Sequence, residues 1–76
     1  MKPCQVEVTF TQNGTPRPRS LTLDGQTLTV IDIGRRWADE SGQHMLVRVA
    51  DGRVYELLYR GAIWQAALRA GKPRHI

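Results

Sequence analysis

The chain has 76 residues, a formal net charge of +4 and an isoelectric point near 10.0. This length predicts one small domain over residues 1–76, near the lower size limit at which a hydrophobic core alone keeps a chain folded. Hydrophobic residues make up 41% of the chain, which favours a globular protein over a disordered one. No apolar run approaches the roughly 18 residues of a membrane-spanning helix.

Cys4 is the only cysteine, which excludes an internal disulfide. Because small secreted domains commonly depend on disulfides, a lone cysteine favours a reducing compartment, and we expect a cytoplasmic protein. The first five residues lack the apolar stretch of a secretory signal, and we expect none.

The first predicted element is a half-buried strand at residues 6–11. Val6, Val8 and Phe10 fall on one face of this strand, and polar side chains fall on the other. The two prolines of the next segment, Thr15–Arg19, lack an N–H and restrict the residues before them. We therefore expect an extended edge segment or a loop there, and not a central strand.

Asp24-Gly25 lies between two β-prone runs and predicts a hairpin with a two-residue turn. This turn places Leu21 opposite Leu28. The resulting register gathers the apolar side chains on one face and the threonines on the other, so the turn and the pattern agree. The apolar face is formed by Leu21, Leu23, Leu28 and Val30.

After Val30 the alternation breaks, because apolar residues fall on both faces of residues 30–33. Either a doubly buried strand or a β-bulge explains this pattern, and Gly34 marks the expected bend. Residues 38–43 are polar and aperiodic, which predicts a loop.

The second hairpin surrounds Ala50-Asp51-Gly52. A three-residue loop with a left-handed Gly52 places Val47 opposite Tyr55 and separates apolar from polar side chains better than a two-residue turn. The polar face is expected to be solvated, and its charged side chains are Arg48, Glu56 and Arg60.

Residues 62–70 are compatible with two structures. Alanine content and the Gly71 stop favour a short helix, whereas a strand would cover an exposed barrel edge, and we favour the strand. The fold prediction is mainly β, with five or six antiparallel strands in a small SH3-like barrel or rolled sheet, and with a frayed tail at 71–76. The predicted core is Val6, Val8, Phe10, Leu21, Leu28, Val30, Ile31, Ile33, Met45, Val47, Val49, Tyr55, Leu57, Trp64 and Leu68.

No residue pattern predicts catalysis or metal binding. Cys4, His44 and His75 lack both a nucleophile motif and zinc-ligand spacing, and His44 is expected at the edge of a loop. Asp39 and Glu40 are expected to be a solvated charge pair. We therefore predict a protein that is not an enzyme and that has no cofactor and no metal.

Arginines interleaved with aromatics are the one suggestive grouping, and arginine supplies most of the eleven cationic side chains. Small basic barrels bind single strands by stacking bases on aromatic rings and pairing phosphates with arginine. The candidate nucleic-acid-binding residues are Arg35, Arg36, Trp37, Arg48 and Arg60. The opposing interpretation places both tryptophans, Trp37 and Trp64, over the core and leaves the arginines as ordinary surface.

The later part of the chain contains a Gly-Arg-Arg-Trp segment, an acidic loop, a Val-Arg-Val-x-Asp-Gly-Arg-Val-Tyr-Glu-Leu run, a Tyr-Arg pair and a tryptophan. This order resembles an uncharacterised family of small bacterial β domains. The family occurs as stand-alone proteins and at the C-terminus of Y-family-polymerase-like mutasome subunits. The resemblance implies a β fold and a DNA-damage-response setting, but no activity. The matching positions are Gly34, Arg36, Trp37, Val47, Arg48, Val49, Asp51, Gly52, Tyr55, Leu57, Tyr59, Arg60 and Trp64.

Two functions follow as expectations. The first is a non-enzymatic interaction or accessory module that docks onto a protein partner, and the second is a weak nucleic-acid-binding accessory. A docking module should expose an apolar patch or an unpaired strand edge. A nucleic-acid binder should gather its arginines on one face around an exposed aromatic ring.

Overall fold

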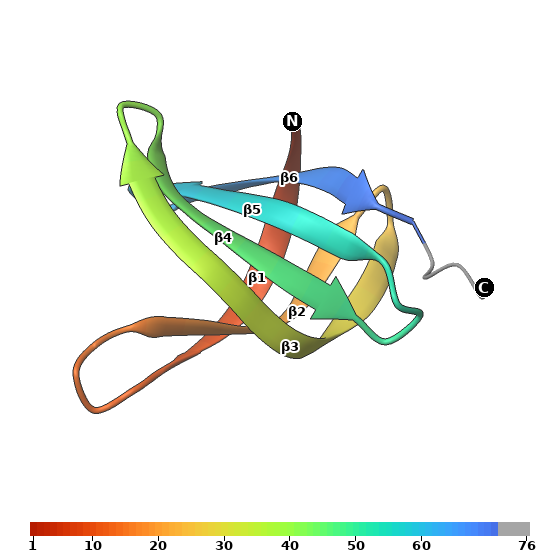
Figure 1. The fold of residues 1–76 in the computed structure, drawn as a ribbon, viewed down its shortest axis with the longest axis horizontal. Helices are drawn as coiled ribbons and strands as arrows, with labels where there is room; N and C mark the ends of the chain where they lie inside the picture. Colours follow the sequence, from red (N-terminus) through yellow and green to blue (C-terminus); the bar gives the residue numbers. More distant parts are fainter. Residues whose placement is uncertain (72–76) are drawn as a thin grey trace.

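A computed structural model describes residues 1–71 of the chain. Six antiparallel strands close into one barrel in chain order, and the described residues contain no helix (Figure 1). The predicted mainly-β barrel is therefore confirmed, whereas the expected frayed tail falls outside the described residues from position 72 on. The strands are β1 Lys2–Phe10, β2 Pro16–Leu23, β3 Gln26–Asp39, β4 Gly42–Val49, β5 Val54–Arg60 and β6 Ile63–Ala70.

Both predicted hairpin registers are present. Leu21 pairs with Leu28 across the β2–β3 turn. Val47 pairs with Tyr55 across the β4–β5 loop, where Gly52 has φ +93° and its N–H donates to the carbonyl of Val49. The positive φ is the backbone state that the glycine-bulge turn requires.

Of the two alternatives for residues 30–33, the structure has the bulge, because the β3–β4 register shifts between Val30 and Asp32 and again between Ile33 and Arg36. The predicted loop at residues 38–43 is wrong. β3 continues to Asp39 and β4 begins at Gly42, so that only a two-residue turn remains. The polar residues there continue the strand pairing on a solvent-facing arm, where strands need no apolar alternation.

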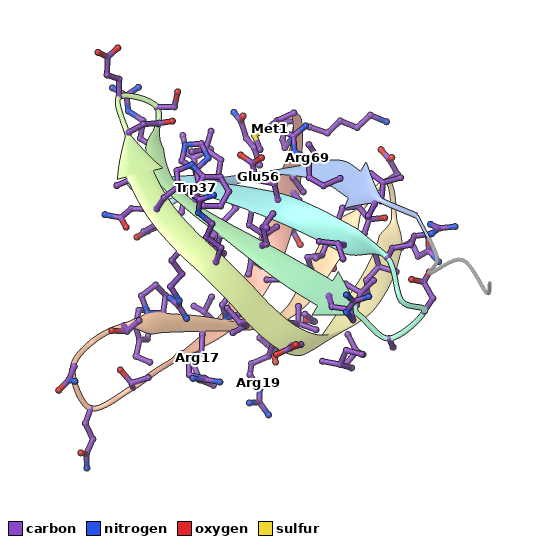
Figure 2. The ribbon with its side chains drawn as sticks, viewed as in Figure 1. Met1, Arg17, Arg19, Trp37, Glu56 and Arg69 are labelled. Atoms are coloured by element: carbon purple, nitrogen blue, oxygen red, sulfur yellow. The ribbon has the colours of Figure 1, made fainter. Side chains whose placement is uncertain are left out.

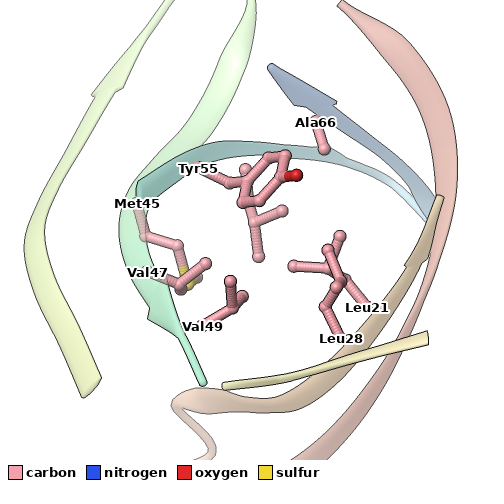
Figure 3. Close-up of a cluster of buried hydrophobic side chains, with 8 residues drawn as sticks. Leu21, Leu28, Met45, Val47, Val49, Tyr55 and Ala66 are labelled. Carbon is pink, nitrogen blue, oxygen red and sulfur yellow. The ribbon is translucent and has the colours of Figure 1, made fainter. Parts of the chain in front are cut away.

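Inward-facing side chains of β2 to β6 form the core (Figure 3). Leu21, Val49 and Leu57 are completely buried. Ala66 is buried but was not predicted, because its small side chain gives little apolar signal. The remaining buried core residues are Leu28, Met45, Val47 and Tyr55, and the partly buried side chains packed against them are Cys4, Val6, Leu23, Val30, Ile33 and Trp64.

Three predicted core residues lie on the surface instead. Phe10 is 67% exposed because it lies at the far end of β1, beyond the part of the barrel that β6 covers. Ile31 is the extra residue of the first β3 bulge and is turned out of the core. Leu68 follows the covered part of β6, since β1 pairs only with Trp64 to Ala66.

The segment at 62–70 contains strand β6, as favoured, and not a helix. β6 pairs with β5 along its length and with β1 at three residues, which closes the barrel. Tertiary pairing therefore overrides the helical propensity of its alanines.

The barrel is closed at one end and open at the other. β2 and β3 pair only between Ser20–Leu23 and Gln26–Thr29, and the β1–β2 and β3–β4 hairpins diverge beyond that point (Figure 1). We call this region the open end, bounded by Pro16–Arg19 of β2 and Ile31–Ala38 of β3.

Candidate functional site

The five predicted nucleic-acid-binding residues do not share one surface. Arg36 pairs with Met45, so it lies on the inward-facing side of β3, because cross-strand partners share a face. Arg48 lies near the β4–β5 loop and donates a hydrogen bond to the carbonyl of Gly52. Arg60 ends β5 at the other end of the β4–β5 hairpin. The expected convergence on one face is absent from this set.

Trp37 already has two ring contacts. Its ring stacks on the imidazole of His44, with 5.0 Å between the ring centroids and an angle of 6° between the planes. The guanidinium carbon of Arg35 lies 5.3 Å from its centroid, within the range of a cation–π contact. Trp37 is half-buried on the outer side of the sheet, whereas Trp64 packs against the core and stacks on Tyr59. The expectation that both tryptophans cover the core therefore holds for Trp64 alone.

Four charged side chains form a chain of hydrogen bonds across the outer face of the sheet, and we call them the His44 network. His44 Nδ1 lies 2.7 Å from Glu56 Oε2, and its Nε2 lies 2.8 Å from Asp39 Oδ1. Arg69 Nε donates to Glu56 Oε1 at 2.8 Å. The side chains come from β3, β4, β5 and β6, and Figure 2 shows Glu56 and Arg69 together on the side that carries Trp37.

Three sequence expectations are corrected by this network. His44 is buried on β4 and is not at a loop edge, and Glu56 is buried and is not on a solvated face. Asp39 is bonded to His44 and is not part of a free charge pair with Glu40. Trp37 stacks on the imidazole from one neighbouring strand and Arg69 bonds to Glu56 from another. The predicted register carried a signal for this contact, because Leu46 opposite Glu56 makes His44 the diagonal neighbour of Glu56.

Both imidazole nitrogens face carboxylates, so a protonated ring can donate to both. The hydrogen bond to Asp39 raises the pKa of His44 above its usual value, although burial opposes the shift. The same bond lowers the pKa of Asp39. Burial acts to raise the pKa of Glu56, but hydrogen bonds from His44 and Arg69 lower it overall. The network therefore favours an imidazolium between two carboxylates.

Two prolines of β2 explain why its backbone pairing with β3 stops at the open end. The carbonyl of Pro16 accepts a hydrogen bond from Arg36 Nη1 at 3.1 Å, so it points toward β3. In an extended strand the N–H and C=O of one residue point to the same edge, and residues two apart repeat that direction. Pro16 and Pro18 therefore occupy both β2 positions that face β3, and neither has an N–H to donate.

The β3 edge at the open end lacks a strand partner among the described residues. Asp32 Oδ1 accepts a hydrogen bond from the N–H of Ile33 at 3.0 Å, which satisfies one donor on this stretch locally. A cavity of about 360 Å³ lies between the two arms, lined on β3–β5 by Arg36, Gln43, His44, Met45 and Tyr59 and on the β1–β2 hairpin by Gly14, Thr15 and Pro16.

The two edges of this opening, residues 16–19 and 31–38, carry four arginines and one carboxylate, that of Asp32. Among residues 1–71, Arg53 and Arg69 are the arginines that form ion pairs with carboxylates. Arg17 and Arg19 project from the β2 arm, on the opposite side of the view from Glu56 and Arg69 (Figure 2). The arginines without a carboxylate partner in this part of the chain are Arg17, Arg19, Arg35, Arg36, Arg48 and Arg60.

The described residues offer neither an activated nucleophile at Cys4 nor a cluster of metal ligands. Burial raises the pKa of the Cys4 thiol, which keeps it protonated and weakly nucleophilic. Residues 1–71 contain no cluster of three or more potential metal ligands. Within the same residues, no helix is long and apolar enough to cross a membrane.

Comparison of the chain with protein-family models, with curated protein sequences and with solved structures finds no match.

Proposed function

We propose that this chain is a non-enzymatic interaction module that docks onto a protein partner through the open end of its barrel. The observation that carries this proposal is the β3 edge at Ile31–Ala38, which has no partner strand within residues 1–71 on the side that faces β2, where the prolines of β2 cannot donate hydrogen bonds. Exposed edges are avoided in monomeric proteins unless they are protected or used, because they pair readily with other chains.

Side-chain chemistry supports a binding role over a catalytic one. Both nitrogens of His44 are held by carboxylates, which leaves neither free to act as a base toward a substrate. No hydroxyl or thiol among the described residues is hydrogen-bonded to this imidazole. The absence of a disulfide partner for Cys4 supports a cytoplasmic setting, and the family resemblance supports an accessory role beside DNA-damage-response proteins.

Panning a random displayed peptide library on the immobilised chain tests this proposal. We expect enriched peptides that bind one to one with micromolar affinity and that shift backbone amide resonances of Ile31–Ala38. A non-binding protein of similar size and charge serves as the counter-selection. Failure to enrich any peptide over that counter-selection would remove the docking function.

Weak single-stranded nucleic-acid binding is the second candidate, and the arginines without carboxylate partners favour it. It ranks lower because those side chains are dispersed over several faces and because the ring of Trp37 is already in contact with Arg35 and His44.

A further inference from the structure

The opening between β2 and β3 has the features of a site that receives an added strand. Backbone pairing between these strands stops at Ser20 and Thr29. Beyond that point, the long side chain of Arg36 connects the two arms through its hydrogen bond to the carbonyl of Pro16. Within residues 1–71, an incoming strand would compete with this contact and with the local hydrogen bond from the N–H of Ile33 to Asp32.

The two edges of the opening differ in their backbone hydrogen-bond donors. Pro16 and Pro18 remove the donors from the β2 edge, which is how proteins block strand pairing. β3 has no proline between Ile31 and Ala38, so its edge retains N–H as well as C=O groups. A partner strand would therefore pair with β3 and only lie beside β2.

The arginines at the opening favour a partner strand that carries acidic side chains. Neighbouring strands in a sheet lie about 4.8 Å apart. A strand that filled the opening between β3 and β2 would therefore place its outward side chains beside Arg35 of β3 and beside the arginines of β2. Arg17 and Arg19 are exposed and have no carboxylate partner among residues 1–71. Arg36 adds a third charge on the inward side.

We propose that an extended acidic segment of a partner protein adds as a strand to the β3 edge at Ile31–Ala38, with acidic side chains at alternate positions facing Arg35 and Arg17. This inference rests on the proposed docking function and specifies its partner. The outward acidic residues pair with arginine, and the inward residues enter the cavity beside Arg36 and Met45, where small or apolar side chains fit.

A synthetic peptide of about ten residues, in which glutamate alternates with valine and threonine, tests the proposal. The matched control peptide carries lysine in place of glutamate. We expect the acidic peptide to bind in fluorescence anisotropy and the lysine peptide not to bind. In NMR spectra the bound state should show new slowly exchanging amides within Ile31–Arg36 and cross-strand contacts between the peptide and β3.

Charge-reversal variants locate the site. Arg17→Glu and Arg35→Glu should each weaken binding about five- to tenfold, because each reversal replaces an attraction with a repulsion. Arg60→Glu is the matched control, since it makes the same charge change on an exposed arginine outside the opening, and it should leave the affinity unchanged. Arg35→Glu also removes the contact between Arg35 and the Trp37 ring. Arg17→Glu changes the charge without disturbing that contact, so it is the cleaner test.

The remaining outcomes overturn the inference. Equal weakening by all three reversals would indicate general charge attraction. Stronger binding by a single-stranded oligonucleotide that loses affinity with Arg17→Glu would assign the opening to nucleic acid. If the acidic peptide fails while library peptides bind at Ile31–Ala38, docking stands and the acidic specificity is wrong. If neither binds, both proposals fail.

Discussion

Glu56 lies diagonally across the β4–β5 hairpin from His44, and the 2.7 Å contact between Oε2 and Nδ1 joins two buried polar side chains on the outside of the barrel. The second imidazole nitrogen bonds to Asp39, and Arg69 completes the charge pattern. A buried polar group without a partner costs free energy, so His44 and Glu56 depend on each other and on the exposed Asp39 and Arg69. Protonation therefore couples to stability.

The stability of the chain should be greatest in mildly acidic solution. The pKa of His44 is raised, so its contribution is complete below the usual value of about 6.5 and is lost as pH rises through the raised value. The pKa values of Asp39 and Glu56 are lowered, so their contributions are complete above about 4.5 and are lost as pH falls through the lowered values. Thermal melts should show a maximum between about pH 4.5 and 6.5.

His44→Gln tests the origin of the alkaline decline. Glutamine donates hydrogen bonds from its amide nitrogen alone and does not titrate, so the variant should be less stable at pH 5 and should lose little further stability between about pH 6 and 9. Asp24→Asn, which removes an exposed carboxylate bonded to Lys2, should retain the decline. An unchanged decline in His44→Gln would contradict the assignment.

Gly42→Ala should destabilise the fold by about 2–4 kcal/mol. A Cβ at this position would lie 2.7 Å from the backbone oxygen of Tyr59, and its φ of +136° is a conformation that other residues rarely adopt. Gly34→Ala is the control, because its Cβ would meet Leu46 at an ordinary 3.8 Å. Chemical denaturation should separate the two variants, and equal losses would show that the turn tolerates a side chain.

Gly52→Val should cost about 1–3 kcal/mol, because a β-branched residue is strained at φ +93°. Gly52→Asn should cost less, since asparagine tolerates positive φ better than other non-glycine residues. A valine variant that melts with the wild-type midpoint would disprove the importance of the bulge turn.

Single-stranded DNA should bind weakly if the basic surface is used, with affinity that falls steeply as salt rises above about 50 mM, by roughly 0.7 log units per neutralised phosphate per log unit of salt. Arg36→Ala and Arg60→Ala should each flatten this slope. Trp37→Ala should leave the affinity nearly unchanged, because the ring is engaged by Arg35 and His44. A large loss of affinity in Trp37→Ala would instead restore a base-stacking role.

Local chemistry was sufficient to predict both hairpin registers. It also narrowed the break after Val30 to a bulge or a doubly buried strand, and Thr15–Arg19 to an edge segment or a loop. Each depends on neighbours in the chain: a glycine that accepts positive φ, an alternating pattern that permits one register, or a proline that lacks an N–H. These features do not depend on contacts with distant segments of the chain.

Burial and closure were decided by tertiary structure. The 63–70 segment is a strand because β5 and β1 offer it backbone partners, which outweighs the helical preference of its alanines. Glu56 and His44 are buried because Trp37 and Arg69 approach from neighbouring strands. Phe10 and Leu68 are exposed because the pairing between β1 and β6 ends before it reaches them. Such coverage depends on contacts between distant segments, which no local pattern encodes.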